Sequence, residues 1–270
     1  MCCRSHVGCI CGTDHADKVA RWNANQTTGT SNLADSTLSA PNAPLRDFSD
    51  ADDDIYAEDV RREAQQVYPQ RTTDIVVVET AEKTGVTPYI MMPPTIYGKG
   101  LGLFNTQSMQ VPSTIRHAID SGYPEYIGTG TGTVGYVHVA DLARLYELLL
   151  GAVLAGKDLP SGRDGFYFSN TGAFTWKDLN EKIGAIGERL GALTSPAAVS
   201  VSLDEAVKKW GWPEEHKLLL EINHAGQSRT TAKRAYELLG WEPKHTSADW
   251  DAEIEEAWKI ILAERDSAKA

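Results

Sequence analysis

Residues 86–100 (VTPYIMMPPTIYGKG) and residues 126–150 (YIGTGTGTVGYVHVADLARLYELLL) decide the fold of this chain. The first stretch opens with a β-type run over 86–92, which the Pro-Pro pair ends because proline has no N–H to give to a sheet. In the second stretch a β-type run at 136–139 precedes apolar residues at helical spacing over 140–151. The two stretches therefore predict strands that alternate with an amphipathic helix.

The same alternation continues along the chain. Residues 73–84 are expected to form a helix that Gly85 ends. Thr175 opens another helix with a Thr-x-x-Asp box. Because β-type runs alternate with amphipathic helices, the predicted fold is α/β with a short, mostly parallel sheet. Its strands are expected near 74–92, 136–139 and 165–169, and further helices at 112–121 and around a C-terminal apolar stripe of Trp250, Ile254, Trp258, Ile261 and Leu262, which indicates core packing.

Composition limits the classes of partner. The chain has 270 residues, of which 41% are hydrophobic, and a net charge of −11. This predicts one domain, or one domain with a small lobe, around a sizeable core. Nucleic acids and anionic membranes need basic patches, so neither is expected as a main partner. No apolar run approaches the roughly 18 residues of a membrane helix and no signal peptide opens the chain, so a cytoplasmic location is expected.

All four cysteines lie at the start of the chain. Thiolates and imidazoles bind soft metals, and two histidines lie among these cysteines. However, the spacings are Cys-Cys and Cys-x-Cys, which differ from the Cys-x2-Cys pairs of zinc sites. We therefore expect no metal, and thiols that stay reduced in the cytosol. The residues are Cys2, Cys3, Cys9 and Cys11, with His6 and His15.

The first 70 residues have an unusual texture. Residues 23–45 are rich in Asn, Thr, Ser, Ala and Pro, and residues 47–59 are strongly acidic. Such segments bury little apolar surface, so loop or weak order is expected. Residues 1–50 are accordingly expected to be mobile and sensitive to proteases.

One glycine motif invites a misleading interpretation. Residues 130–135, GTGTVG, satisfy the dinucleotide pattern G-x-G-x-x-G. That pattern needs a helix that opens inside the loop, so that helix N–H groups face the pyrophosphate. Here a β-type run follows, so the loop is predicted to be a hairpin turn. Residues 98–102, GKGLG, carry Lys99 but have the wrong flanks and are predicted to be a flexible loop.

Three segments carry a resemblance to a known family. They are Met-Pro-Pro-Thr-Ile-Tyr-Gly at 92–98, Val-His-Val-Ala-Asp-Leu-Ala at 137–143 and Leu-Gly-Trp-Glu-Pro at 239–243. In this order the chain resembles the extended short-chain dehydrogenase/reductase family, the NAD-dependent epimerase/dehydratase group that includes nucleoside-diphosphate-sugar epimerases. The similarity extends over about residues 26–250. It implies a partial Rossmann-like parallel sheet and a C-terminal, mostly helical substrate lobe.

The resemblance also implies catalytic residues. The family uses a Ser/Thr hydroxyl that orients the substrate, a Tyr that exchanges the proton, and a Lys four residues after the Tyr. Thr28 and Tyr56 stand at the first two positions. Val60 stands where the Lys is expected, and Arg61 beside it is a poor replacement because arginine does not exchange protons. The alternative for Tyr56 is a tyrosine in a solvated loop.

Cofactor and substrate residues follow from the same resemblance. The Pro-containing turn lies beside the nicotinamide in the family, which makes Pro93, Pro94 and Thr95 candidate cofactor-binding residues. Tyr97 and His138 are candidates on the side of the substrate lobe. The implied cofactor is NAD or NADP and the implied partner a small-molecule substrate, with a homodimer left open.

The glycine-rich opening of the family is not found in this sequence. Binding of NAD or NADP is therefore expected to be weak. The predicted organisation is a frayed segment at 1–25, an incomplete NAD(P)-binding Rossmann-like domain at 26–175 and substrate-lobe helices at 176–270. The main hypothesis is an impaired NAD(P)-dependent oxidoreductase or epimerase that acts on an alcohol, an aldehyde or a sugar-nucleotide carbonyl. The alternatives are a non-catalytic relative or truncated gene product that binds a small molecule or a partner, and a cysteine-based metal or redox module.

Overall fold

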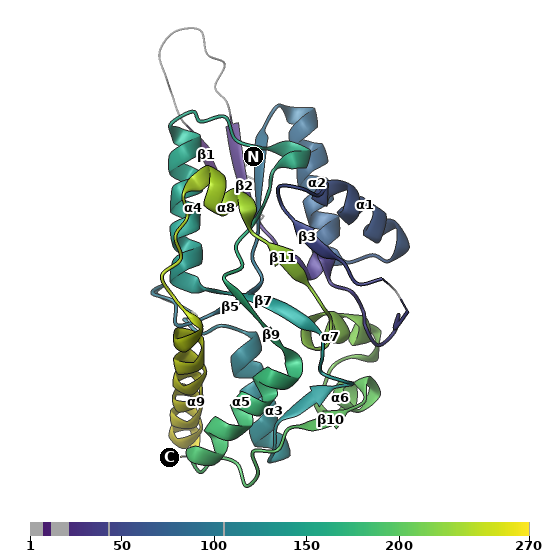
Figure 1. Cartoon of the computed structure of the whole chain (residues 1–270), viewed down its shortest axis with the longest axis vertical. Coiled ribbons are helices and arrows are strands. Elements are labelled where there is room, and N and C mark those ends of the chain that lie inside the picture. The colour runs from purple at the N-terminus through teal and green to yellow at the C-terminus, as the bar shows by residue number, and fades with distance from the viewer. Residues whose placement is uncertain (1–7, 12–21, 43, 105, 270) are drawn as a thin grey trace.

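The computed structural model describes residues 8–11, 22–42, 44–104 and 106–269. Figure 1 shows an elongated molecule with the main sheet and its helices in the upper half and a group of helices in the lower half. None of the helices in these ranges is long and apolar enough to cross a membrane. The helices are α1 (Ile55–Gln65), α2 (Pro69–Thr84), α3 (Gln110–Ser121), α4 (Val139–Leu154), α5 (Trp176–Arg189), α6 (Leu203–Lys209), α7 (Lys217–His224), α8 (Lys233–Leu239) and α9 (Ser247–Lys269).

Three parallel strands form the centre of the main sheet. β2 (Trp22–Thr27), β4 (Thr87–Met92) and β8 (Phe166–Phe168) run in one direction, and β1 (Gly8–Cys11) pairs antiparallel with β2. Parallel neighbours need crossover connections, and the helices α1 to α4 lie in the two connections of this sheet. The predicted α/β class with a Rossmann-like parallel sheet is therefore confirmed.

The strand that follows β4 in the sequence belongs to a second sheet. β5 (Thr95–Tyr97) lies beside β7 (Thr133–His138) in parallel, and β7 pairs antiparallel with β9 (Gly172–Thr175). The prediction that residues 136–139 join the main sheet is therefore wrong. The Pro-Pro pair after β4 removes two ladder donors, so the chain resumes as β5 with a different neighbour.

Two short parallel pairs join distant parts of the chain. β3 (Asp47–Ser49) pairs with β11 (Arg229–Thr231), and β6 (Glu125–Ile127) pairs with β10 (Val199–Val201). The predicted hairpin around the GTGTVG loop is wrong, because β6 does not pair with β7. The loop instead connects two different sheets, and β7 follows it where a phosphate-binding loop would have a helix.

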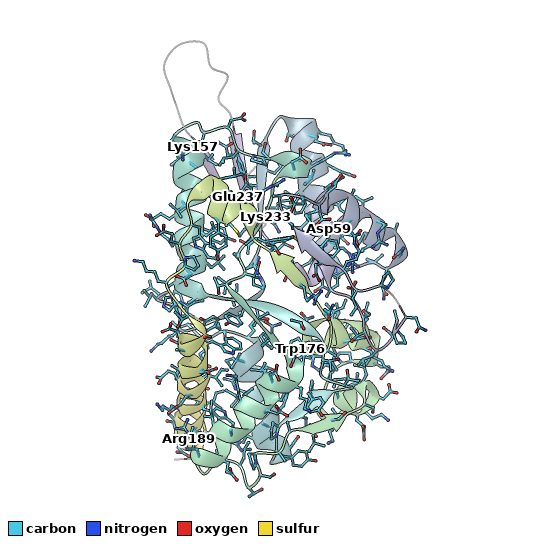
Figure 2. All side chains as sticks on the ribbon, viewed as in Figure 1. Asp59, Lys157, Trp176, Arg189, Lys233 and Glu237 are labelled. Atoms are coloured by element: carbon cyan, nitrogen blue, oxygen red, sulfur yellow. The ribbon has the colours of Figure 1, made fainter. Side chains whose placement is uncertain are left out.

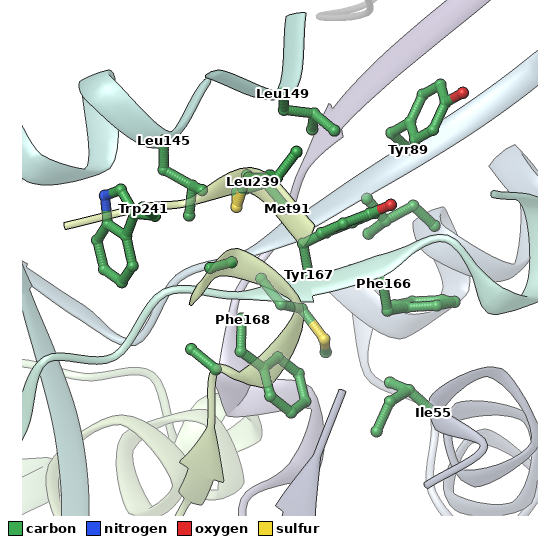
Figure 3. Packing of buried hydrophobic residues seen from close by; sticks show 14 of the residues in the cluster. Ile55, Tyr89, Met91, Leu145, Leu149, Phe166, Tyr167, Phe168, Leu239 and Trp241 are labelled. Atoms are coloured by element: carbon green, nitrogen blue, oxygen red, sulfur yellow. The ribbon is translucent and has the colours of Figure 1, made fainter. Parts of the chain in front are cut away.

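Apolar side chains from the main sheet and from α4 and α8 form the first hydrophobic core. Figure 3 shows Met91 and Tyr167 from the strands against Leu145 and Leu149 of α4, with Trp241 at the edge. All five are at most 1% exposed, so the face of α4 expected from its sequence pattern is the buried one.

The second core lies among α3, α5 and α9. The predicted stripe on α9 is confirmed, since Trp250, Ile254 and Trp258 are all buried in this core. The predicted start of α5 is also confirmed, because the Thr175 hydroxyl accepts the Asp178 N–H at 3.1 Å. This core therefore has the tryptophans as packing residues.

The acidic segment after residue 46 is more ordered than its composition predicts. It forms β3 and then α1, and Phe48 is 2% exposed. Asp53 and Asp54 accept backbone N–H groups within the segment, which explains why carboxylates occur here. The expectation of a loop over 47–59 is therefore wrong, since these carboxylates stabilise a turn and a helix start.

The expectation of a loop over 23–45 is wrong at its start, because β2 covers Trp22–Thr27 and a 3-10 turn covers Thr30–Leu33. Several other N-terminal predictions fall outside what the structure describes. Cys2, Cys3, His6 and His15 lie outside the described residues, as do the side chains of Cys9 and Cys11. The expected reduced thiols and the protease sensitivity of 1–50 stay predictions. The division at 175/176 also stays a proposal, and both cores contain residues from each side of it.

Candidate functional site

The carboxyl ends of β2 and β4 meet and bring several predicted site residues together. Thr28 follows β2 and donates its N–H to the Met91 carbonyl at 2.9 Å. Two residues on, the Thr30 N–H reaches the Pro93 carbonyl at 3.0 Å. Thr28 and the Pro-containing turn are therefore neighbours, as expected for strands that end at one edge of a parallel sheet.

The second sheet approaches this edge of the main sheet at Gly135 of β7. A Cβ on Gly135 of β7 would lie 3.1 Å from the Cβ atoms of both Pro94 and Asn170. This is tighter than side chains normally approach, so the absence of a side chain lets β7 lie against the edge. Asn170 follows β8, so the carboxyl ends of β4 and β8 and the strand β7 converge here.

A pocket of about 520 Å³ opens at this convergence. Asn170 and Gly135 lie on one side of it, and β11 and α8 form the other side. Its volume falls within the range of small-molecule sites, and its position at the carboxyl end of a parallel strand is typical of ligand sites in α/β folds. The lining residues are Thr133, Gly135, Asn170, Thr171, Gly172, Ala173, Arg229, Thr230, Thr231, Ala232, Lys233, Tyr236 and Glu237.

Two cations at the pocket are paired with the acidic segment. Arg229 pairs with Asp47 of β3, and Lys233 pairs with Asp52 at 2.5 Å. The side chains of these four residues are between 40% and 61% exposed, so the pairs are solvated and weak. They can therefore exchange partners for an anionic ligand at little cost.

Asp50 holds the two walls of the pocket together. Its carboxylate is fully buried and accepts the Phe168 N–H of β8 at 2.9 Å and the Arg234 N–H of α8 at 3.1 Å. Burial raises the pKa of Asp50, while these backbone hydrogen bonds pull it down. The sequence showed this residue only as part of an acidic run, and no local pattern distinguishes it from its neighbours.

Tyr56 lies in α1 and not in a solvated loop. It is 6% exposed, and the Arg163 guanidinium lies 4.8 Å from the centroid of its ring. Arg163 is ion-paired with Glu82 near the end of α2, and α2 leads into the amino end of β4. Tyr56 is therefore at the opposite end of the strands from Thr28, and burial raises the pKa of its hydroxyl. The structure does not bring the two predicted catalytic residues together.

The lysine position after Tyr56 is also unsuited to catalysis. Val60 is 41% exposed on α1. Its neighbours Arg61 and Arg62 both bind the Glu58 carboxylate, at 2.5 and 2.7 Å. Because these arginines are ion-paired with Glu58, they are not available to interact with the Tyr56 hydroxyl.

Tyr97 and His138 lie at the junction of the two halves of the molecule. The Tyr97 ring is 2% exposed and meets the His138 and Trp250 rings edge to face at 5.1 and 4.8 Å. His138 Nδ1 accepts the Ala140 N–H at 3.1 Å and so caps α4. Burial raises the pKa of Tyr97 and lowers that of His138. Both residues have structural roles here, and Tyr97 also lines a cavity of about 30 Å³ beside α9.

The described residues at this edge could contact one part of a dinucleotide cofactor but not its pyrophosphate. β2 runs into the 3-10 turn Thr30–Leu33, β4 into β5 and β8 into β9. Among the described strands of the main sheet that run parallel, none is followed directly by a helix whose N–H groups could face a pyrophosphate. Thr95 has a buried hydroxyl with no partner in the described chain, which leaves a polar contact available beside Pro94. The edge therefore fits a small polar group and lacks a diphosphate cradle.

Part of this chain matches a family model and a curated relative. Residues 41–159 match the model of the NAD dependent epimerase/dehydratase family. Uncharacterized protein C2A9.02 of Schizosaccharomyces pombe is 27% identical over 184 residues, which cover 68% of this chain and 53% of that protein. The chain thus spans about half the length of this curated relative.

Solved structures share the fold at low identity. The dTDP-glucose 4,6-dehydratase DesIV from Streptomyces venezuelae, solved with NAD and TYD bound, is 14% identical with a TM-score of 0.56, covering 90% of this chain and 61% of DesIV. The dTDP-glucose 4,6-dehydratase from Bacillus anthracis str. Ames, solved in complex with NAD, is 13% identical with a TM-score of 0.51, covering 87% of this chain and 60% of that one. These similarities show the fold.

Proposed function

Since this chain is related in sequence and fold to the NAD-dependent epimerase/dehydratase group of extended short-chain dehydrogenases/reductases, we propose that it binds a small polar substrate in the pocket at the carboxyl edge of β8. The substrate is an alcohol, an aldehyde or a sugar-nucleotide carbonyl compound. The observation that carries the proposal is the 520 Å³ pocket between Asn170, Gly135 and the β11–α8 segment. Thr28, Pro93 and Pro94 converge at the same edge of the sheet, and Pro94 lies against Gly135 of the pocket lining, which supports the same position.

Roles for the residues at this edge follow from their placement. Thr28 presents a hydroxyl at the end of β2, and Pro93, Pro94 and Thr95 line the edge where a nicotinamide ring would lie. A bound nicotinamide would supply hydride chemistry. The described residues supply orientation through hydroxyl groups and exclude water through the close approach of β7.

Weak or absent turnover is the second part of the proposal. Tyr56 lies under Arg163 at the far end of the strands, and Val60 cannot lower its pKa. A chain with these features binds substrate more readily than it converts it. The non-catalytic relative is therefore the favoured alternative, since it needs the pocket but neither the Tyr nor the Lys.

The test is a binding experiment on the full chain. dTDP-glucose, NADH and NADPH are each titrated, with tryptophan fluorescence or NMR as the readout. We expect dTDP-glucose to bind, and the two nicotinamide cofactors to bind more weakly because the pyrophosphate lacks helix N–H donors.

Two lysines give a matched pair of variants. Lys233 lies on α8 at the pocket and Lys157 lies after α4 away from it, as Figure 2 shows. Lys233→Ala and Gly135→Val should weaken binding of dTDP-glucose, while Lys157→Ala should not. Absence of dTDP-glucose binding, or binding that ignores both pocket variants, would show that the pocket is not the substrate site.

A further inference from the structure

A pair of buried carboxyl groups lies behind Thr28. Asp59 of α1 and Asp74 of α2 are both 0% exposed, and Figure 2 shows Asp59 on α1 in the upper half of the molecule. Both oxygens of Asp59 and Oδ1 of Asp74 have no hydrogen-bond donor among the described groups. A buried, ionised carboxylate without donors is costly, so the charge state of this pair needs a physical explanation.

The arginines near this pair of carboxyl groups donate their hydrogen bonds to other acceptors. Arg71 is the cation of α2 closest in sequence, and its guanidinium donates to the carbonyl oxygens of Asn32 and Gln66 at 2.7 and 2.8 Å. Arg71 and Arg62 attract Asp59 through space but donate no hydrogen bond to it. The carboxylates that hold these two arginines are Glu63 for Arg71, and Asp35 and Glu58 for Arg62.

The two carboxyl groups have different surroundings. Asn32 donates its side-chain N–H to Asp74 Oδ2 at 2.7 Å and to Thr28 Oγ1 at 3.3 Å. Burial raises the pKa of Asp74 to about 6, and hydrogen bonds from Thr28 and Asn32 hold it from rising further. Burial, and then the charge of Asp74, raise the pKa of Asp59 to about 8. At neutral pH the negative charge therefore belongs on Asp74 and the proton on Asp59.

We propose that Asp59 and Asp74 form one proton-binding site, in which the Asp59 carboxyl donates its proton to the free Oδ1 of Asp74 and the ionised Asp74 holds the Thr28 hydroxyl. This arrangement gives a partner to Asp74 Oδ1 and to one of the two unpartnered oxygens of Asp59. Asp59 and Asp74 are positioning residues, because they act on the carboxyl edge through Thr28.

The pair also decides what Thr28 offers to a ligand, a step that rests on the proposed function. Since Asn32 donates to Thr28 Oγ1, the Thr28 hydroxyl proton points to Asp74. The remaining lone pair of Oγ1 is an acceptor. Thr28 therefore recognises a ligand that donates a hydrogen bond, such as an alcohol, in preference to a carbonyl oxygen.

A bound metal ion explains the cluster less well. Ca²⁺ and Mg²⁺ take six or more oxygen ligands. Asn32 turns its NH2 group, a donor, toward Asp74, and Arg71 adds a positive charge nearby. The amide donor matches an ionised Asp74, and both features disfavour a cation between the two carboxyl groups, so metal binding becomes an outcome of the test.

The test uses full-length protein with ¹³C-labelled aspartate carboxyl groups, followed by NMR between about pH 4 and pH 9. We expect two resonances that titrate together, in steps near pH 6 and pH 8. Asp74→Asn should move the Asp59 step to lower pH, because the neighbouring negative charge is gone. Thr28→Val should move the Asp74 step to higher pH, because a hydrogen bond to the ionised form is lost. Asp158→Asn, at an exposed position, should change neither step.

Several outcomes would overturn the proposal. Titration of both carboxyl groups below about pH 5 would show two ordinary carboxylates. Millimolar Mg²⁺ or Ca²⁺ that shifts both resonances would show a metal site. If Asp74→Asn does not fold, Thr28→Val still tests the proposal. An unchanged Asp74 titration step in Thr28→Val would show that Asp74 does not bind the Thr28 hydroxyl. None of these measurements needs a substrate. A failure of the proposed substrate binding therefore does not contradict the proton site, and a failure of the titration does not contradict the pocket as a substrate site.

Discussion

The imidazole rings of His138 and His245 stack face to face, with centroids 3.5 Å apart and planes 14° apart. His138 caps α4, and His245 Nδ1 lies 2.9 Å from the Asp141 carboxylate in the first turn of the same helix. The stack thus ties the start of α4 to the segment that leads into α9. Two cationic rings at this distance would repel each other, so at least one must be neutral.

The first prediction concerns this stack. Burial, and next the neighbouring His245, lower the pKa of His138. His245→Gln should therefore move the titration of His138 to higher pH, which NMR of the ring Cε1–H can follow. His216 is on the exposed 3-10 turn Glu214–His216, so His216→Gln serves as the control. An unchanged His138 titration in His245→Gln would mean that the rings do not interact.

The second prediction concerns pH and stability. The pKa values of Asp59 and Asp74 are raised in the folded state, so the folded protein binds more protons than the unfolded one. Stability from such groups is complete below their unfolded pKa near 4 and is lost as pH rises through about 6 and 8. The buried His224, whose pKa burial lowers to about 4, acts in the opposite direction only below about pH 6.5.

Urea unfolding between about pH 6.5 and pH 8.5 isolates the carboxyl pair. The midpoint should fall across this window in the unmodified chain, and Asp59→Asn should remove most of the fall. Asp158→Asn should keep the full pH dependence. A midpoint that stays flat in the unmodified chain would contradict the prediction.

The third prediction compares two glycines in the left-handed region. Gly85 has a φ of 73° and nothing within 4 Å of an added Cβ, whereas Gly98 has a φ of 87° and an added Cβ would fall on the His138 ring. Gly85→Ala should cost only the left-handed strain, about 1–2 kcal/mol. Gly98→Ala should cost roughly 1–3 kcal/mol more, because the His138 ring must move. Chemical denaturation measures both, and equal losses would mean that the ring yields freely.

The fourth prediction concerns Asp50. Asp50→Ala leaves the buried N–H groups of Phe168 and Arg234 without an acceptor, which should cost about 3 kcal/mol or more. It should also loosen α8 and weaken ligand binding in the pocket. Asp52→Ala, two residues away, removes exposed contacts with Lys233 and Ser49 and should change the unfolding midpoint little. Similar effects of the two variants would argue against Asp50 as the link between the pocket walls.

The sequence predicts the long elements well because their signals are local. α2 ends at Gly85, whose φ of 73° is a left-handed cap, and α5 starts at the Thr175 cap. β3 and β11 gave no such signal, because three-residue strands are specified by partners far along the chain. α1 is not predicted for a related reason, since its Glu58 carboxylate is paired with Arg46, Arg61 and Arg62, and composition does not reveal such contacts.

The candidate site was predicted in part. The resemblance names Thr28, Pro93 and Pro94 as candidates, and the structure brings them to one edge because strand ends in a parallel sheet meet there; their roles stay predictions. Asn170 and Gly135 were not predicted, because their proximity depends on how the second sheet docks. The positions of Tyr97 and His138 were noted, and a role toward a substrate lobe stays a prediction for both.

The pairing of β3 with β11 has a consequence for how the chain is made. Asp47 and Arg229 face each other across 182 residues of sequence. At the usual speed of synthesis, β3 leaves the ribosome on the order of 10–40 s before its partner exists. During that interval the acidic segment and one wall of the pocket have no counterpart. The pocket is therefore among the last parts to form, and a nascent chain that stops before β11 holds most of the main sheet but lacks the β11–α8 side of the pocket.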